Sequence, residues 1–524
     1  MAPPEATTTI RSQNQYTAAD VRELIEQGRK VIMFRGQVLD ISRWIPYHPG
    51  GEEALIHGIG RDVTNEILAL HPREVIQVQM ARFAIGKYIS PELSCEPLLP
   101  TPKTHLPVSP PNSPPTPSGH KMLQQQRQHA WSEQDKLGEK TIKEHQGLSA
   151  SYEALYAEVE RLGYLDMPYK GYQTDLIRIP ILFLTALALL FLAPTSILAQ
   201  IVSACCMGMA WQQASFIAHD MGHCAFSLNR RWDYFLGIIL GNFFGGVSIG
   251  WWKHNHNVHH IITNHPYDDP DIHHMPFFAV STHLLGGFYS SYYQRFFAWS
   301  KAASFFVSLQ HYLYYFVLSL ARFNLYVRSW SHLLFRSTDP LYLLELLGLV
   351  TFSTWYTLLL TYTLPSRAAM LGYLYLSHAV SGIIHVQITM SHFGMSTELL
   401  GPHESFPGKI LRTTMDFDCP TYVDWFHGGL QYQVAHHFFP RAPRHTLREL
   451  TGLISVWAKE HGLTYTHFGW VEGNGFVLGQ MRSIANQVKF VVDVGKEQWA
   501  YQPPTDPHVI PHETLDRMGL KRQF

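Results

Sequence analysis

The sequence has little net charge, few cysteines and no apolar stretch near its start. Its 40 Lys and Arg residues almost balance 41 Asp and Glu residues, so the charge gives no reason to expect nucleic-acid binding. The five cysteines form no CxxC pair and no evenly spaced framework, which argues against a disulfide scaffold and favours a reducing environment. The opening run MAPPEATTTIRSQNQ lacks the apolar core of a signal peptide. We therefore expect the N-terminal part to stay in the cytosol.

Charged residues are also missing from one long segment, because no Asp, Glu, Lys or Arg occurs from 179 to 219. At about 20 residues per crossing, this length predicts two membrane spans. We place them at about 179–199 and 200–218, with a turn near 193–196, and place two further spans at 341–364 and 368–390. Lys and Arg follow the second span but are absent from the turn, which puts the downstream segments in the cytosol.

Histidine is abundant instead, with 31 residues, and many of them gather in three short clusters. A lone histidine is most often a core or loop residue, but positions i, i+3 and i+4 of a helix share one face and can chelate a metal. Neutral imidazole suits Zn, Cu, Fe or Ni. One ion takes only three or four protein ligands, so we expect two ions, and iron is the metal that would activate O2. The clusters are His219 and His223; His256, His259 and His260; and Gln433, His436 and His437.

The segment 302–321 is also long enough to cross a membrane. The third histidine cluster must lie on the same side as the first two, which requires an even number of crossings between them. We therefore expect 302–321 to be an interfacial helix, whose Gln310, His311 and aromatic residues suit the headgroup level. Glu345 inside the third predicted span weighs against this choice.

Residues 16–88 predict a small α+β domain with a helix at 18–27 and a strand over 30–41. His48 begins the run HPGGEE, where two glycines allow the backbone to turn closely under a flat ligand. Haem iron takes axial ligands from opposite sides, and a second histidine, His71 or His57, follows. The runs DISRWIPYHPGG and GRDVTNEILALHP are similar to the cytochrome b5 fold. This resemblance implies heme b with His48 and His71 as axial ligands.

The three histidine clusters resemble the histidine boxes of the membrane-bound lipid desaturase and hydroxylase superfamily, and Gln433 resembles the first position of the third box in front-end desaturases. The runs HNVHHIITNHPYDDPDIHHMPFFAV, ARFNLY and QVAHHFFPRAPRHTLREL look most similar to fungal sphingolipid Δ8-desaturases. Ala435 departs from the broader front-end desaturase pattern, which has Glu at this position. This departure bears on the subfamily and not on the chemistry. The resemblance also assigns His392 as a metal ligand.

This resemblance implies a multi-domain protein, an α+β haem domain followed by an all-α membrane domain with four transmembrane helices and a cytosolic cap. We expect the haem domain at 12–90, a proline-rich linker at 91–123 that suits a mobile carrier or a plain spacer, and the desaturase-like domain at 124–524. The implied reaction uses O2, two iron ions and electrons from cytochrome b5 reductase to place a double bond at C8 of the long-chain base of ceramide. The implied location is the endoplasmic reticulum membrane, with both termini cytosolic.

Three alternatives remain open. The first is a front-end acyl desaturase of the Δ6 type. The second is a membrane-anchored cytochrome b5 that only carries electrons, although an anchor needs one span and no histidine clusters. The third is hydroxylation, because hydroxylases use the same ligands as desaturases.

Overall fold

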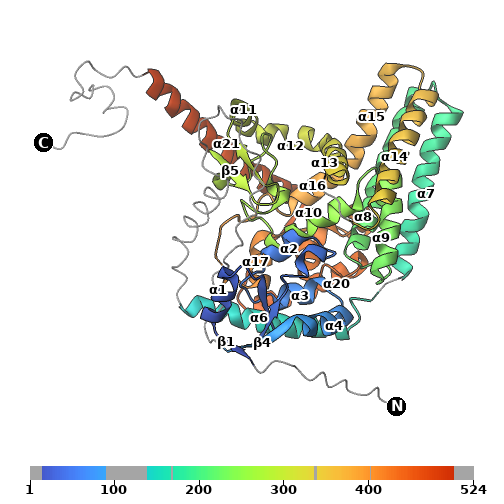
Figure 1. Ribbon diagram of the computed structural model, residues 1–524. Coiled ribbons are helices and arrows are strands. Elements are labelled where there is room, and N and C mark those ends of the chain that lie inside the picture. Colours follow the sequence, from blue (N-terminus) through green and yellow to red (C-terminus); the bar gives the residue numbers. More distant parts are fainter. Residues whose placement is uncertain (1–13, 90–138, 167–168, 336–338, 402, 501–524) are drawn as a thin grey trace, which may run out of the picture.

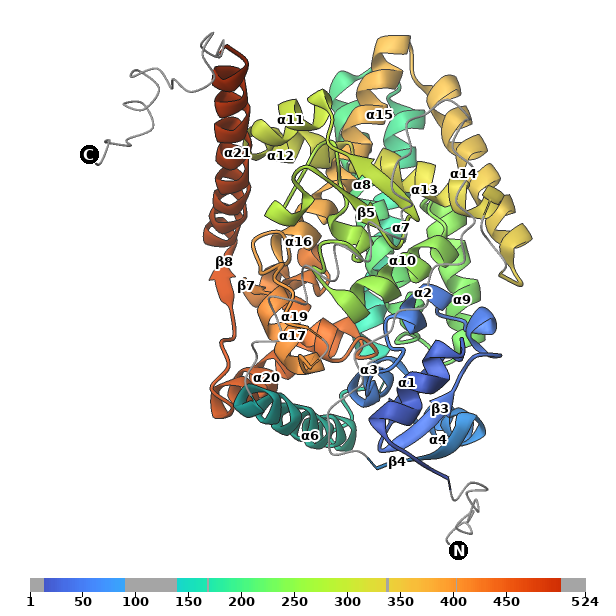
Figure 2. The ribbon, with the colours of Figure 1, turned by 60° about the vertical axis from the view of Figure 1, so that its left-hand side comes forward.

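The computed structural model describes residues 14–89, 139–166, 169–335, 339–401 and 403–500. The predicted linker at 91–123 and residues 12–13 of the predicted haem domain lie outside these ranges. Figure 1 shows the N-terminal domain, in blue, below a group of long helices that stand side by side. The same arrangement is seen after a turn of 60° in Figure 2.

The N-terminal domain, residues 14–89, combines one sheet with short helices, as the α+β prediction required. Its sheet has the strand order β1-β4-β3-β2, with β1 parallel and the other neighbours antiparallel. The strands are β1 (Gln15–Tyr16), β2 (Val31–Phe34), β3 (Gln37–Asp40) and β4 (Ala84–Tyr88). The helices are α1 (Ala18–Glu26), η1 (Ile45–Tyr47), α2 (Glu52–Ile56), α3 (Thr64–Leu70) and α4 (Arg73–Phe83).

Local sequence explains the start of this domain. Thr17 caps α1 in a capping box with Asp20, so that the helix begins at Ala18. The single strand expected over 30–41 is instead a hairpin of β2 and β3. Its two-residue turn, Arg35-Gly36, has φ values of 47° and 70°, which match the twist of paired strands.

A layer of helices joins the N-terminal domain to the rest of the chain. These helices are α6 (Glu139–Arg161), α17 (Phe406–Thr413), α19 (Gln433–Phe438) and α20 (Leu447–Glu460). One apolar core contains Ile67 of α3, Tyr152 of α6 and Phe438 of α19. The buried Tyr152 hydroxyl also donates to the Phe438 carbonyl at 2.6 Å. The N-terminal domain is therefore packed firmly against the segment that carries the third histidine cluster.

Four helices in the described part of the chain are long and apolar enough to cross a membrane, as predicted. The first extends back to Lys170, earlier than the expected 179, because Arg178 pairs with Asp175 one turn away at 3.0 Å and both polar groups are accommodated within the helix. The turn occupies residues 193–196. The helices are α7 (Tyr169–Leu192), α8 (Ile197–Gly222), α14 (Tyr342–Thr363) and α15 (Arg367–Ser381), which α16 (Ile383–Met390) continues.

The segment 302–321 divides into α11 (Lys301–Ser308) and α12 (Gln310–Ser319), and it is not among the four apolar spans. Tyr312 and Phe316 point outward, with 70% and 58% exposure. Gln310, however, is fully buried and bonds to the backbone of Ala279 and Met481, so it anchors the helix to protein rather than to lipid headgroups.

The second histidine cluster lies on a helix that follows a sharp bend. Helix α9 (Arg230–Ile238) continues into the π-helical η2 (Ile239–Phe244), and α10 (Ile249–Ile262) then leaves at 112°. Helix α13 (Ala321–Phe335) packs against α10. Two small strand pairs follow, β5 (Gly287–Ser290) with β6 (Arg295–Ala298) and β7 (Asp416–Asp418) with β8 (His467–Gly469). The other elements are α18 (Asp424–His427), α21 (Trp470–Ala500) and the short 3-10 helices η3 (Pro270–Ile272), η4 (Thr282–Leu284), η5 (Thr421–Val423), η6 (Leu430–Tyr432) and η7 (Arg444–Thr446).

Candidate metal centre

Four separate segments bring the clustered histidines together. His219 lies in the last turn of α8, and His223 is its C-cap residue. Helix α10 supplies the second cluster, and α19 supplies the third. His392 follows the end of α16 by two residues, and the Asn264 side chain holds its carbonyl at 2.8 Å.

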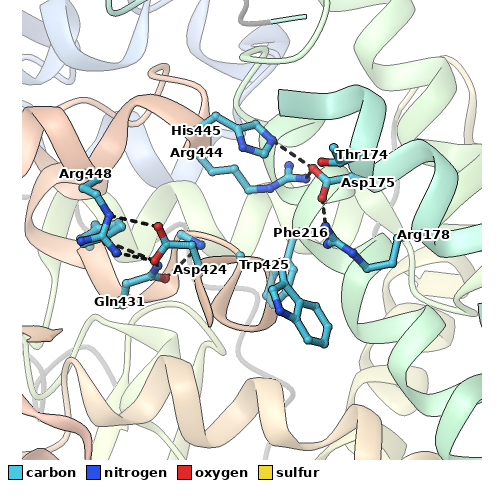
Figure 3. Close-up of a pocket in the computed structure, with 13 residues that line it drawn as sticks. Thr174, Asp175, Arg178, Phe216, Asp424, Trp425, Gln431, Arg444, His445 and Arg448 are labelled. Atoms are coloured by element: carbon cyan, nitrogen blue, oxygen red, sulfur yellow. Dashed lines mark hydrogen bonds and ion pairs between the residues drawn. The ribbon is translucent and has the colours of Figure 1, made fainter. Parts of the chain in front are cut away.

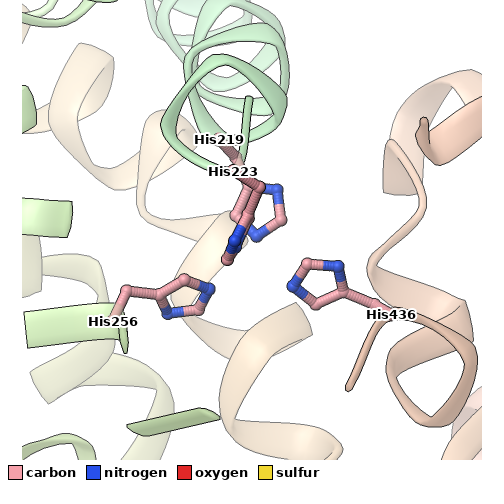
Figure 4. Close-up of side chains that lie close together, drawn as sticks. All are labelled: His219, His223, His256 and His436. Carbon is pink, nitrogen blue, oxygen red and sulfur yellow. The ribbon is translucent and has the colours of Figure 1, made fainter. Parts of the chain in front are cut away.

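The first group of side chains is drawn in Figure 4. It contains one ring nitrogen from each of four histidines, and these nitrogens all lie within 4.8 Å of one another. The rings come from three elements, so that no single helix could have formed the group alone. Its members are His219, His223, His256 and His436.

The second group contains His259, His392 and His437, whose nitrogens also lie within 4.8 Å of one another. His260 lies between the two groups, with ring centroids 4.7 Å from His436 and 4.3 Å from His437. The structure therefore offers two adjacent positions for a metal ion, with the His260 imidazole between them. Gln433, also predicted as a ligand, is buried one turn before His436.

The chemistry of these nitrogens fits metal ions. The Nε2 atoms of His223, His392, His436 and His437 are buried and have no hydrogen-bond partner within the described residues. Such atoms are costly unless a ligand satisfies them. Burial lowers the pKa of His436 and His437 well below the usual value, so both imidazoles are neutral and able to donate a lone pair.

Carboxylates hold one histidine of each group from behind. His259 Nδ1 donates to Asp269 Oδ2 at 2.9 Å, and Asp271 lies 3.8 Å from the same nitrogen. Burial would lower the pKa of His259, but these two carboxylates outweigh it and raise the pKa to about 9. In the first group, His219 Nδ1 faces Asp220 at 3.4 Å. A carboxylate behind an imidazole fixes the tautomer that points its other nitrogen at a metal.

Asp220 connects the first group to a polar cavity of about 180 Å³, shown in Figure 3. Arg444 donates to Asp220 at 2.7 Å and also to Asp175, which lines the cavity. Tyr172 donates to Asp220 at 2.6 Å. The cavity wall and the support of His219 are therefore one hydrogen-bonded network.

The two expected haem histidines face each other in the N-terminal domain, with ring centroids 5.9 Å apart. His48 Nδ1 donates to the Gly51 carbonyl at 2.9 Å, and His71 Nδ1 donates to the Ile67 carbonyl at 3.2 Å. Both bonds leave Nε2 free for iron, and burial lowers both pKa values to about 4, which keeps the rings neutral. His57 is instead the C-cap of α2, and the ring that faces His48 is that of His71. This arrangement fits haem.

Comparison with family models decides the identity of the larger domain. The fatty acid desaturase model matches residues 195–469, more than half of the chain. The chain belongs to the fatty acid desaturase family. A cytochrome b5-like haem/steroid binding domain model matches residues 17–89. The protein is thus an O2-dependent oxidoreductase of lipid chains, with haem and a di-iron centre as the cofactors that the two families imply.

Several curated relatives match nearly the whole chain. A Delta 8-(E)-sphingolipid desaturase of Komagataella phaffii is 38% identical over 90% of this chain and 94% of its own length. A protein of the same name from Emericella nidulans is 36% identical, also over 90% and 94%. Delta(8)-fatty-acid desaturase 1 of Arabidopsis thaliana is 30% identical over 91% and 94%.

Sequence reasoning missed the acidic residues of the desaturase site. Asp269 and Asp271 follow His260 by nine and eleven residues, and that proximity was the available signal. Asp220 follows His219 directly, and that adjacency was also available. The role of Arg444 had no such signal, because its partners Asp220 and Asp175 are distant in the sequence.

Proposed function

We propose that this desaturase introduces a double bond at C8 of the long-chain base of ceramide, using O2 and electrons from its own haem domain. The observation that carries the proposal is the convergence of seven histidines into two adjacent nitrogen groups, with His260 between them, beside a b5-like domain. The named activities of the relatives from Komagataella phaffii and Emericella nidulans support the position of the double bond and the sphingolipid substrate.

We assign the haem to His48 and His71, and the two irons to the two histidine groups. When bound, the irons supply O2 activation and the haem supplies single electrons. The chain itself holds these groups in place: Asp269 and Asp220 orient one imidazole of each group, and the Gly51 and Ile67 carbonyls orient the haem histidines. The metal ligands that we propose are His219, His223, His256, His259, His260, His392, Gln433, His436 and His437.

We further propose that the protein lies in the endoplasmic reticulum membrane and that the histidine side of its membrane domain faces the cytosol. We also propose that cytochrome b5 reductase reduces the haem. Basic residues support this orientation, because Arg230, Arg231 and Lys253 follow α8 whereas the turn at 193–196 carries none. Reporter tags inserted after Arg328 and after the C-terminus should both be cytosolic. A lumenal tag at the first position would restore 302–321 as a span.

The test of function is expression in a host that lacks Δ8-unsaturated sphingoid bases, followed by mass spectrometry of hydrolysed ceramides. We expect Δ8-unsaturated bases from the wild type and none from His436→Ala. His461→Ala is the matched control, because His461 lies outside both groups and bonds to the Trp457 carbonyl. Δ6 fatty acids without a change in sphingoid bases would contradict the substrate, and hydroxylated bases would contradict the reaction.

A further inference from the structure

The loop that carries the first haem histidine touches the helix that carries the second histidine cluster. The Gly50 carbonyl accepts a hydrogen bond from Asn257 Nδ2 at 3.1 Å, and α2, which begins directly after the loop, packs along α10. Figure 2 shows α2 beside α10. Asn257 directly follows His256 of the first metal group and precedes the His259–His260 pair by two residues. One helix therefore contacts the haem loop and contributes to both metal groups.

Two glycines make this close approach possible. A Cβ atom at Gly50 would lie 2.8 Å from His48 Cε1 and 3.0 Å from Asn257 Nδ2. A Cβ atom at Gly51 would lie 2.9 Å from His254 Nδ1 of α10, and Gly51 has a φ of 94°. Only a residue without a side chain allows the haem histidine and α10 to press on the loop from both sides. The HPGG run is thus a docking element as well as a ligand loop.

A second contact comes from the segment after α19. Arg441, four residues beyond His437, donates from Nη1 to the His71 carbonyl at 3.3 Å. Its Nε is buried and has no hydrogen-bond partner within the described residues. A haem carries two carboxylates, and a guanidinium is the side chain that matches a carboxylate best. Arg441 is therefore suited to hold a haem propionate from the desaturase side.

We propose that this contact is the docking surface through which the haem domain passes electrons to the metal centre, with Asn257 and Arg441 as its positioning residues. The inference rests on the haem and iron assignments proposed above. In each transfer one electron leaves the haem iron, which changes from ferrous to ferric, and one ferric iron of the metal centre becomes ferrous. No bond to the substrate changes in this step. The haem is then reduced again by a flavoprotein reductase or, in the test, by dithionite.

Two exposed ion pairs also join the domains and provide a control. Arg35 lies 3.2 Å from Glu153, and Arg73 lies 3.8 Å from Glu160. Exposed pairs of this kind contribute little to stability, because solvent screens them. The Arg73 side chain is 69% exposed, so Arg73→Gln removes an interdomain charge without touching the haem loop.

The experiment uses the full chain loaded with haem and iron, and compares Asn257→Asp, Arg441→Gln and the control Arg73→Gln. The aspartate would set a carboxylate against the Gly50 carbonyl, so that two acceptors repel each other. Hydrogen exchange of residues 45–58 reports docking independently of turnover. Stopped-flow re-oxidation of dithionite-reduced haem, on mixing with O2 and ceramide, reports electron transfer. Haem spectra and iron content are measured for each variant.

In both test variants we expect faster hydrogen exchange and at least tenfold slower haem re-oxidation, with wild-type haem spectra and iron content. For Arg73→Gln we expect exchange and re-oxidation rates within twofold of wild type. Unchanged exchange, or unchanged re-oxidation despite faster exchange, would overturn the proposal. Loss of iron in both variants would also overturn it, because the residues would then serve the metal sites. If only Asn257→Asp loses iron, the exchange and re-oxidation rates of Arg441→Gln decide whether the proposal stands. Normal re-oxidation in the wild type without a Δ8 product would sink the proposed substrate and leave the docking surface intact.

Discussion

Glu345 is a carboxylate buried within a membrane span, and its removal should loosen the helix that carries the second histidine cluster. Its side chain has no exposed surface and accepts four hydrogen bonds. Two come from Ser248 Oγ at 2.5 Å and Gly250 N at 3.2 Å, at the start of α10, where a negative charge is favoured. The others come from Tyr234 Oη at 2.5 Å and Asn242 Nδ2 at 3.1 Å. Glu345 therefore joins α9, η2, α10 and α14.

The variant Glu345→Leu leaves Ser248 Oγ and Gly250 N without their acceptor, whereas Asn242 Nδ2 still donates to the carbonyl of residue 345 at 3.1 Å and Tyr234 keeps a side-chain hydrogen bond with Asp339. At about 1–3 kcal/mol for each of these two unsatisfied buried donors, the gross cost is about 2–6 kcal/mol. Removing the buried carboxylate recovers part of its desolvation, so we expect a net loss of about 2–4 kcal/mol. Glu345→Gln keeps one acceptor oxygen and should cost less, about 1–2 kcal/mol.

The assay is the thermal midpoint of the iron-loaded protein in detergent, together with its iron content. At about 2 °C per kcal/mol, Glu345→Leu should lower the midpoint by about 4–8 °C and release iron first. Leu347→Ala, at a lipid-facing position of the same helix, is the control and should change little. A wild-type midpoint for Glu345→Leu would refute the reasoning. An equal loss in Glu345→Gln would show that the charge matters rather than the number of acceptors.

Three further outcomes are expected. In the full chain, His71→Ala should abolish the six-coordinate haem spectrum and His57→Ala should not, and the reverse would move the axial ligand to His57. Asp269→Asn should weaken iron binding about 10–100-fold in metal titrations, because it frees the His259 ring, while an unchanged affinity would remove Asp269 from the site. Burial raises the pKa of Asp416 to about 7, so its neutral form is favoured in the folded protein. Its contribution to stability should therefore fall as pH rises from about 4 through 7, and a wild-type slope in Asp416→Asn would contradict this.

The two redox sites differ in how far the sequence predicts them. The haem histidines lie in one short domain whose runs, such as DISRWIPYHPGG, carry the resemblance without any knowledge of distant contacts. The metal groups could be predicted because each cluster is dense in histidine over a few residues. Which histidine joins which group depends on how α8, α10 and α19 cross, so no spacing separates His256 from His259.

Features that depend on contacts between distant segments could not be predicted from the sequence, because spacing does not show how those segments pack. In the sequence alone, Glu345 argues against a membrane span, because its hydrogen-bond donors at the start of α10 become evident only in the folded structure. The pairing of Asp175 with Arg178 and Arg444 likewise hid the true start of the first span. The hairpin turn at Arg35-Gly36 was marked in the sequence only by one glycine between the apolar runs of 31–34 and 38–39. In each case a tertiary partner overrides the local pattern.

The contact between the Gly50 loop and α10 has a consequence for the order in which electrons enter and leave the haem. The side of the haem domain that α10 and Arg441 contact is covered in this arrangement. If the reductase proposed above binds the haem domain on that same side, it can do so only when the domain has left α10. The supplier of electrons and their consumer must then take turns, and each double bond, which needs two electrons, requires two such exchanges. Under this arrangement, turnover is set by how fast the domain leaves and returns, and adding more reductase beyond that rate brings no gain.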